Sequence, residues 1–276
     1  MKKYLLTGIP RSGTTLSCKI LNSLHNVIAL HEPLSPNKLT SITPEHAIIE
    51  VKHQIDSIEG KLVRGEPFEH GSTASLILDN PIQEKHTGEL RRLRARRGLL
   101  ALPPQIETAN LIIKQNALFA ALLPLAIQYY QVVSIIRNPV DVFLSWMNVD
   151  LPVNRGRIPG GERFNNELKQ KLEATSRVSE RQVIIYEWFI TQYQNFASRV
   201  LKYEDIVDTQ GAILANAFGF TEKPTVEIKN IKRSYDKKTI DQLESVISTN
   251  SESLSSEHYS INDISHRLEE VCASKQ

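Results

Sequence analysis

The chain has 276 residues, of which 41% are hydrophobic and 23% are charged, and its formal net charge at pH 7 is +2. This composition is typical of a globular protein, and so small a net charge gives no reason to expect binding to nucleic acid or to a membrane surface. The two cysteines, Cys18 and Cys272, lie far apart in the sequence and form neither a zinc-binding nor a disulfide pattern. They fit a reducing compartment, in which thiols usually stay free.

The N-terminal residues resemble a signal peptide only briefly. Met1-Lys2-Lys3 is followed by an apolar run that ends by Thr7-Gly8, which is shorter than the about 7–15 apolar residues of a signal peptide. No run approaches the ~20 apolar residues of a membrane-spanning helix. We therefore expect a cytoplasmic protein.

Short apolar runs alternate with helical patterns along the chain. The apolar runs cover residues 4–6, 27–30, 111–113, 132–136 and 200–201. The helical patterns cover residues 14–24, 117–129, 140–146, 181–197 and 239–254. Short runs of Val, Ile and Leu are typical of strands that are buried on both faces of a parallel sheet. The alternation predicts an α/β protein with a central, mostly parallel sheet flanked by helices.

Two segments, residues 36–110 and 150–175, are less regular and carry proline, serine and charged residues without clear strand runs. We interpret the chain as a single domain, 1–276, in which these segments are insertions that cap the ligand site. Residues 91–97 in the first segment include five arginines. These form either a solvated helical face or a lid that attracts an acidic substrate.

The residues that follow the predicted strands indicate where a ligand binds. In open α/β sheets, ligands bind in the crevice outside the carboxyl ends of the strands. The groups expected to converge there are the loop 8–15, Glu32, Lys114, Arg137 and Tyr203. Any one polar strand end could simply reflect the polarity of loops, but together these groups predict a site for an anionic ligand.

The stretch GIPRSGTTL is close to the phosphate-binding loop G-x-x-x-x-G-K-[ST]. Gly8 and Gly13 have the required spacing, but Thr14 stands where the lysine would be, and the positive charge is at Arg11. Because the loop follows a strand and precedes a helix, its main-chain N–H groups and the helix N-terminus can form an anion-binding nest. The hydroxyl groups expected to add donors are those of Ser12, Thr14 and Thr15. The loop is consistent with a P-loop-like three-layer fold, and a nucleotide with a single 5′ anion chain and no γ-phosphate would not require the missing lysine.

Two motifs resemble those of sulfotransferases that use 3′-phosphoadenosine 5′-phosphosulfate (PAPS). PRSGTT is similar to the family's loop for the 5′-phosphosulfate group, and IIRNPVDVFLSW contains the frame R-[DN]-P-x-D-x-x-x-S. In the family the Arg and Ser of this frame, here Arg137 and Ser145, bind the 3′-phosphate. The frame is physically sensible because Pro139 suits the first turn of a helix. An Arg at a strand end and a hydroxyl on that helix can then hold one phosphate from two sides.

Two further segments extend the resemblance, which spans residues 4 to about 250 in the family's order. KYEDI is similar to the family's Y-E-D-L strand end, whose tyrosine, here Tyr203, lies near the adenine. KNIKRSYD occupies the place where family members often close a basic loop over the nucleotide, which implies a role for Arg233. A solvated basic turn is the alternative for this last segment.

The resemblance implies metal-independent sulfuryl transfer from PAPS to a hydroxyl or amine of a small-molecule acceptor, with adenosine 3′,5′-bisphosphate as the product. Cytosolic members use the histidine of a K-T-H segment as the base, but the matching Lys114-Gln115-Asn116 has no base, because Asn116 cannot take up a proton at neutral pH. Another branch, similar to the tyrosylprotein sulfotransferases and some bacterial enzymes, uses a Glu after the second strand. Glu32 occupies that place.

We therefore predict Glu32 as the general base, with Arg11 and Lys114 stabilising the transition state. His31 is the rival base, and neighbouring residues of an extended chain point to opposite sides, so only one of the two is expected to face the sulfur. Glu32 could instead be an ion-pair partner of Arg11 or an exposed strand end.

Two other functions are compatible with parts of the sequence. A P-loop kinase that uses ATP and Mg²⁺ is disfavoured by the missing lysine and by the lack of a clear acidic metal ligand, since Asp205 is the only aspartate at a strand end. A non-catalytic nucleotide-binding module would leave Glu32 unexplained. The sequence leaves the identity of the acceptor and the oligomeric state open.

Overall fold

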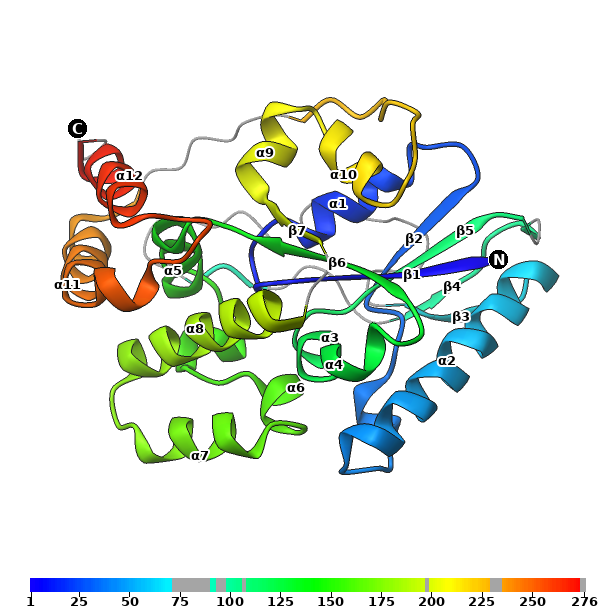
Figure 1. The fold of residues 1–276 in the computed structure, drawn as a ribbon, viewed down its shortest axis with the longest axis horizontal. Coiled ribbons are helices and arrows are strands. Elements are labelled where there is room, and N and C mark those ends of the chain that lie inside the picture. The colour runs from blue at the N-terminus through cyan, green and yellow to red at the C-terminus, as the bar shows by residue number, and fades with distance from the viewer. Residues whose placement is uncertain (71–89, 93–97, 106–107, 197–198, 229–234, 274–276) are drawn as a thin grey trace.

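The computed structural model of the chain describes residues 1–70, 90–92, 98–105, 108–196, 199–228 and 235–273. A sheet of five strands lies at the centre, in the order β2-β5-β1-β6-β7 (Figure 1). The strands are β1 (Lys2–Gly8), β2 (Val27–His31), β5 (Asn110–Lys114), β6 (Gln131–Ile136) and β7 (Arg199–Lys202). All neighbouring pairs are parallel, so the carboxyl ends of the strands lie at one edge of the sheet. The predicted α/β fold with a central parallel sheet is confirmed.

Helices cover both faces of this sheet (Figure 1). One face carries α1 (Thr14–Leu21), α9 (Tyr203–Asp208) and α10 (Ala212–Ala217). The other carries α2 (Pro44–Arg64), α3 (Ala117–Ala121), α4 (Leu123–Ala126) and α8 (Val178–Phe196). Further elements are α6 (Pro159–Glu162), α7 (Asn166–Ala174), the 3-10 turns Pro36–Lys38 and Pro152–Arg155, and the antiparallel pair β3 (Phe68–His70) and β4 (Gly98–Leu100).

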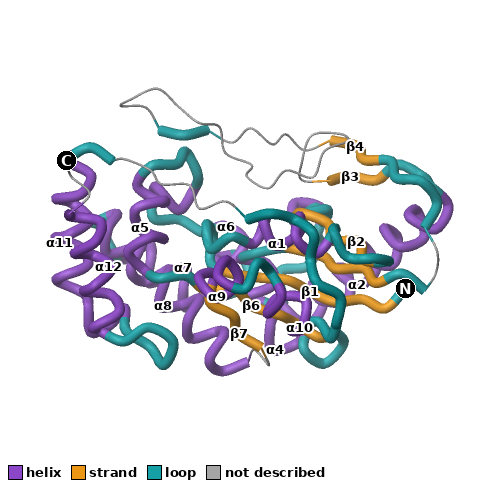
Figure 2. The backbone as a smooth tube through the Cα atoms, turned by 90° about the horizontal axis from the view of Figure 1, so that it is seen from above, coloured by secondary structure: helices purple, strands orange, loops and turns teal. Residues whose placement is uncertain are grey.

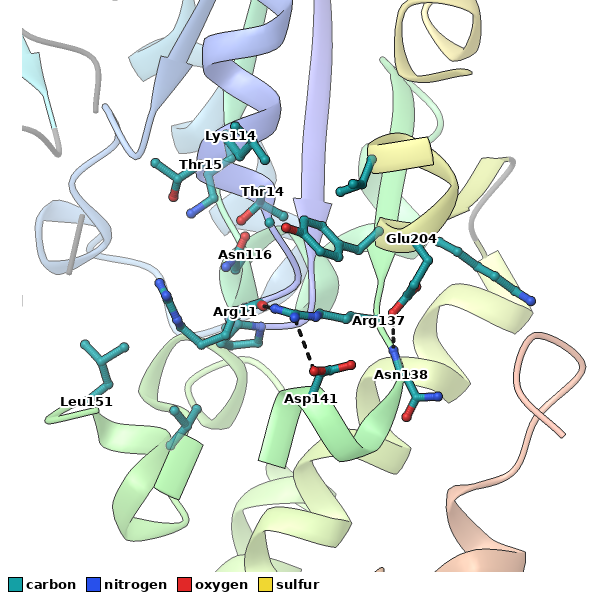
Figure 3. A pocket seen from close by; sticks show the side chains of 18 of the residues that line it. Arg11, Thr14, Thr15, Lys114, Asn116, Arg137, Asn138, Asp141, Leu151 and Glu204 are labelled. Carbon is teal, nitrogen blue, oxygen red and sulfur yellow. Dashed lines mark hydrogen bonds and ion pairs between the residues drawn. The ribbon is translucent and has the colours of Figure 1, made fainter. Parts of the chain in front are cut away.

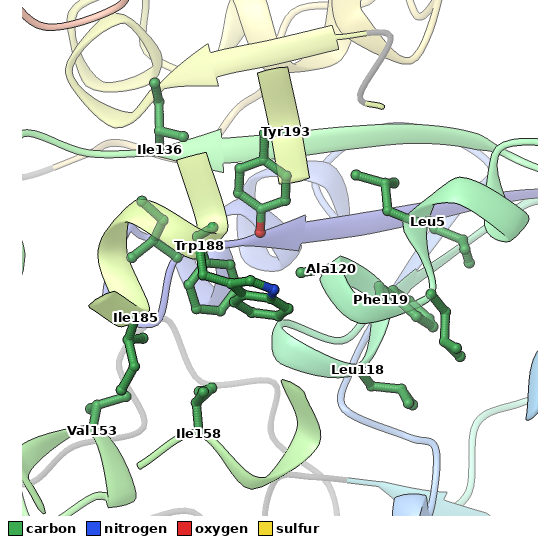
Figure 4. Packing of buried hydrophobic residues seen from close by; sticks show 14 of the residues in the cluster. Leu5, Leu118, Phe119, Ala120, Ile136, Val153, Ile158, Ile185, Trp188 and Tyr193 are labelled. Carbon is green, nitrogen blue, oxygen red and sulfur yellow. The ribbon is translucent and has the colours of Figure 1, made fainter. Parts of the chain in front are cut away.

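The strands are continuous apolar runs because both of their faces are buried. In β1, Leu5 packs into the cluster that includes α2, α3 and α8, whereas Leu6 packs into the cluster that includes α1 and α10. Successive side chains of a strand point to opposite faces, so each strand supplies both clusters. Figure 4 shows Leu5 and Phe119 in the first cluster, with Trp188 and Tyr193 of α8 nearby.

The C-terminal helices pack away from the start of the chain. Helices α11 (Lys237–Leu254) and α12 (Ile261–Ala273) pack against each other and against α5 (Pro139–Met147). Figure 2 shows them at one end of the molecule, with the N-terminus at the other. Leu243 and Ile247 of α11 are buried, as the expected apolar face of residues 239–254 requires. Helix α12 was not expected from the sequence. Among the described helices, none is both long and apolar enough to span a membrane.

Two other helices differ from the sequence-based expectation. The single helix expected over residues 117–129 is instead α3 and α4, because Pro124 has no N–H to donate to Ala120 and a continuous helix would be interrupted there. Helix α1 ends at Leu21 rather than at residue 24, and the side chain of Asn22 bonds both the N–H and the C=O of Ala29 in β2.

Helix α2 lies in the segment 36–110, which the sequence analysis describes as less regular and for which it predicts no helix. Its buried residues, with spacings of three and four, are Ala47, Ile48, Val51, Ile55, Ile58 and Leu62. Its second half is fixed to the start of β1, where Lys3 Nζ lies 2.6 Å from both Asp56 Oδ1 and Glu59 Oε2. This part of the segment therefore packs on the core at the end of β1 opposite the strand's carboxyl end.

Candidate active site

A cavity of about 1390 Å³ opens at the carboxyl ends of the sheet strands (Figure 3). The predicted site residues that line it are Arg11, Gly13, Thr14, Thr15, Glu32, Lys114, Arg137 and Tyr203. The expected convergence of the strand ends on one crevice is therefore observed. We call the loop 8–15 with Glu32 and Lys114 the loop end of the cavity. The clamp end is formed by Arg137, Asp141 and Tyr203.

The loop that follows β1 is held in place by neighbouring elements. Trp146 Nε1 donates to the carbonyl of Pro10 at 2.8 Å. A Cβ on Gly8 would lie 2.7 Å from the carbonyl oxygen of Ile135, so the strand–loop junction fits closely against β6. Gly13 has a φ of 84° and precedes α1 without a side-chain cap. The first N–H groups of α1 thus have no side-chain cap, which leaves the predicted anion-binding nest a prediction that this geometry allows.

Ser12 plays a different part from the one expected. Its hydroxyl donates to the carbonyl of Ile135 at 3.0 Å, its N–H donates to Ile9, and it is fully buried. The expectation that Ser12 adds a hydroxyl donor to the anion nest is therefore corrected, because the group is used to fix the loop to β6. Among the described residues around the cavity, Thr14 and Thr15 supply the hydroxyl groups of this loop.

Tyr203 lies over the loop at the start of α9. A Cβ on Gly13 would come within 2.3 Å of the Tyr203 ring, so only a glycine leaves room for it. On the same ring, the guanidinium carbon of Arg137 lies 4.5 Å from the ring centroid. The ring thus links the two ends of the cavity, and a Cβ on Gly13 would displace it.

Arg137 has polar contacts through its two terminal nitrogens. Its Nη1 donates to the carbonyl of Arg11 at 3.3 Å, and its Nη2 lies 3.4 Å from Asp141 Oδ1 (Figure 3). Its Nε is buried and has no hydrogen-bond partner in the part of the chain that the structure describes. A buried donor without a partner is unusual in a folded protein and suggests a ligand acceptor.

Ser145 is predicted to bind one phosphate together with Arg137, but its hydroxyl contacts Arg11 instead. Its Oγ accepts from Arg11 Nε at 3.2 Å, the residue is buried, and it is not among the described residues that line the cavity. In this arrangement Ser145 orients Arg11. That Ser145 and Arg137 together bind one phosphate stays a prediction.

Glu32 and Lys114 form an ion pair at the ends of neighbouring strands. Lys114 Nζ lies 2.6 Å from Glu32 Oε1, and the side chains are 2% and 39% exposed, respectively. Burying an ammonium group requires an opposite charge, so Glu32 compensates for Lys114. Glu32 is thus engaged in an ion pair with Lys114, and an ion pair with Arg11 stays a prediction.

Two candidate catalytic residues have a left-handed backbone. Among the described residues other than glycine, positive φ occurs at Arg11 (75°), Asn26 (54°), Glu32 (48°) and Gln210 (49°). Such a conformation costs about 1–3 kcal/mol at each residue and is concentrated at functional sites. It directs the side chains of Arg11 and Glu32 at the points where the chain leaves β1 and β2.

His31 has a poor environment for a base. Burial, with the charge of Lys114 adding to it, lowers the pKa of His31 from 6.5 to about 3. Its Nδ1 lies 3.5 Å from Thr15 Oγ1, and its main-chain N–H donates to His70 Nε2 at 3.0 Å. A histidine with so low a pKa binds a proton weakly at neutral pH.

Several further residues for which the sequence predicts no role hold the site in place. The Oδ1 of Asn116 is buried without a partner among the described residues, and Thr7 Oγ1 donates to its carbonyl at 2.9 Å. Glu204 accepts from the N–H of Asn138 at 3.1 Å and from the hydroxyl of Tyr259 at 2.5 Å. Glu204 was within the motif KYEDI, but no local signal connects it to Tyr259, which lies 55 positions along the chain.

Two predictions fall wholly or partly outside the described residues. Arg233 lies outside them, as do residues 93–97 of the arginine cluster. Arg91 is buried and forms a β-bridge with Val149, so it does not belong to a solvated helical face. Among the described residues, no group of three or more His, Cys, Asp and Glu side chains is arranged to hold a metal ion.

Comparison with known proteins adds one finding. The family model described as the sulfotransferase domain matches residues 1–266. No curated protein matches the chain significantly.

Proposed function

The chain belongs to the sulfotransferase domain family, as its motifs predicted, and on this basis we propose that it transfers the sulfuryl group of PAPS to a small acceptor. The observation that carries the proposal is that one cavity contains both the uncapped start of α1 and the partly unpartnered Arg137. A donor with an anionic group at each end of an adenosine requires two such places in one crevice.

The residues at both ends fit this donor. At the loop end, Arg11, Thr14 and Thr15 with the first amides of α1 would hold the 5′-phosphosulfate group. At the clamp end, the unpaired Nε of Arg137 would bind the 3′-phosphate, and Tyr203 would lie near the adenine. When bound, the donor supplies an activated sulfuryl group.

Glu32 is the proposed general base. Its carboxylate accepts the proton that the acceptor hydroxyl or amine loses as the new bond to sulfur forms. Lys114 and Arg11 stabilise the negative charge that grows on the phosphate as its bond to sulfur breaks. The low pKa of His31 favours Glu32 over its neighbour for this role.

The acceptor is proposed to enter on the side of Arg11 away from Glu204, where Figure 3 shows Leu151. The uncharged residues that line the cavity are mostly apolar and include Pro36, Ala117, Leu118, Leu151, Val153 and Ile158. Such a wall suits a small hydroxyl- or amine-bearing acceptor with an apolar body.

Calorimetry and a transfer assay test the proposal. Adenosine 3′,5′-bisphosphate should bind with the same affinity in EDTA and in Mg²⁺, and labelled sulfate should move from PAPS to members of a panel of alcohols, phenols and amines. No binding of the bisphosphate, together with tight binding of ATP that depends on Mg²⁺, would overturn the proposal in favour of a kinase.

A further inference from the structure

Arg267 of α12 is bound to the clamp end from outside the motifs. Its Nε donates to Asp141 Oδ2 at 2.9 Å and its Nη2 donates to Asp141 Oδ1 at 2.9 Å. Its Nη1 lies 2.7 Å from Glu270 Oε2. A two-bond contact between guanidinium and carboxylate is the strongest geometry for such a pair. The hydrogen bonds to Asp141 raise the pKa of Arg267, which therefore stays charged.

Asp141 is shared unequally between two arginines. Its distance to Arg137 Nη2 is 3.4 Å, longer than the about 2.7–2.9 Å of a good charge-assisted hydrogen bond. Arg137 lies between β6 and the N-cap of α5, and Asp141 lies in the first turn of α5, so the two side chains are close enough for an ion pair. The carboxylate is nevertheless held by Arg267, and Arg137 keeps a buried Nε without a partner among the described residues.

The rest of the C-terminal segment is connected to the same place. Tyr259 donates to Glu204, and Asn138 Nδ2 donates to the carbonyl of Asp263 at 3.5 Å. Helix α12 thus contacts Asn138 and Asp141, the residues that follow Arg137 at the start of α5. Arg267 lies one residue beyond the stretch that the family model matches.

A carboxylate beside Arg137 competes with any anionic ligand. If Asp141 were not paired elsewhere, it would draw closer to Arg137 and would repel a phosphate at the same position. We propose that Arg267 is a positioning residue that holds Asp141 away from Arg137 and so keeps the Arg137 guanidinium available for the phosphate of the nucleotide. This inference rests on the proposed function.

A double-mutant cycle tests the inference, with adenosine 3′,5′-bisphosphate as the calorimetric probe. Arg267→Gln should weaken binding about tenfold, because Asp141 then pairs with Arg137. Asp141→Asn alone should raise the affinity, because the carboxylate beside Arg137 is removed, and a loss of affinity in this variant would contradict the inference. The double variant Asp141→Asn with Arg267→Gln should recover an affinity within about threefold of the wild type, because no carboxylate remains to compete.

The affinities of the variants would differ from these values if Arg267 only stabilised the fold or contacted the ligand directly. If the double variant binds as weakly as Arg267→Gln, or if Arg267→Gln binds like the wild type, the inference is wrong. Arg64→Gln is the matched control, since Arg64 is exposed and pairs with Glu66 at 2.7 Å away from the cavity. Thermal melts of each variant fix a temperature at which all are folded.

Binding of the bisphosphate to the wild-type protein tests the proposed function separately from the role of Arg267. If the wild-type protein does not bind the bisphosphate, the proposed function is overturned and the inference falls with it. If the wild type binds and Arg137→Ala does not, while Arg267→Gln binds normally, only the role of Arg267 is refuted.

Discussion

At the loop end of the cavity, the groups proposed to bind an anion come from one short stretch, residues 8–15, and depend on main-chain amides placed by β1 and α1. At the clamp end, the groups are the side chains of Arg137, which follows β6, Asp141 of α5 and Tyr203 of α9. Arg267 of α12 pairs with Asp141. The loop end therefore depends on backbone conformation, and the clamp end depends on how charges are shared among side chains. Substitutions should affect the two ends in different ways.

The largest expected effect is at Glu32, which belongs to the loop end but is proposed to act on the acceptor. Glu32→Gln should lower turnover by about 10²–10⁴-fold and change the affinity for adenosine 3′,5′-bisphosphate by less than about threefold. The amide can still accept a hydrogen bond from Lys114 but no longer balances the charge of its buried ammonium group, so the variant should lose stability, and both assays are run at a temperature at which thermal melts show it folded. Steady-state kinetics and calorimetry measure the two quantities.

Glu66→Gln is the control for that variant, because Glu66 is exposed and pairs with Arg64. Normal turnover in Glu32→Gln would remove Glu32 from the chemistry.

A methyl group at Gly13 tests the loop end itself. Gly13→Ala combines a left-handed backbone, which costs about 1–2 kcal/mol for any other residue, with a clash at 2.3 Å against Tyr203. We expect a loss of bisphosphate affinity of about 100-fold, because the amides and the Tyr203 ring shift together. Calorimetric titration with the bisphosphate measures it.

Gly219→Ala is a matched control, since Gly219 has a φ of 85° but its Cβ would meet nothing within 4 Å. It should lose stability without losing affinity. Equal affinities in the two variants would mean that the fit of Tyr203 over Gly13 does not matter for binding.

At the clamp end, Arg137→Ala should weaken bisphosphate binding by roughly 10–100-fold. A hydrogen bond to a charged group contributes about 1.5–3 kcal/mol, and this variant loses such a bond to the 3′-phosphate. Arg137→Lys should fall between the wild type and Arg137→Ala, because it keeps the charge and loses the planar fork. Competition binding with adenosine 5′-monophosphate identifies the group involved, since this ligand lacks the 3′-phosphate and should be insensitive to both changes. An equal loss of affinity for both ligands would show that Arg137 does not bind the 3′-phosphate.

The last prediction concerns the stability of the fold near His31 and not ligand binding. The pKa of His31 is about 3 in the folded protein, whereas an unperturbed histidine has a pKa of 6.5, so between these values the unfolded chain binds a proton that the folded protein does not. Acidification through this range therefore favours unfolding, by up to about 1.4 kcal/mol per pH unit. Urea unfolding between pH 6.5 and 4 should show a shallower decline in the free energy of unfolding for His31→Asn than for the wild type. Identical slopes would show that His31 titrates normally.

Much of the loop end could be predicted from the sequence because its signals are local. Gly8, Gly13 and Arg11 lie within one motif, and Lys114 ends a recognisable strand. Helix α2 also carried a readable signal in the spacing of Ile48, Val51 and Ile55, which the sequence analysis overlooked.

The sequence could not predict how hydroxyls and charges are used once the elements pack. Ser12 and Thr14 stand two positions apart in one motif, yet Ser12 bonds β6 and Thr14 lines the cavity. Ser145 bonds Arg11 although its spacing suggested Arg137. These choices depend on which group a side chain meets across the sheet.

The family, the parallel sheet and the charged residues at the strand ends can be predicted from the sequence, because apolar runs and loop motifs are encoded over a few neighbouring residues. The carboxylate that each arginine binds depends on how distant elements pack. Arg267 and Asp141 are 126 positions apart, and nothing local specifies a pair that forms only when α12 packs against α5.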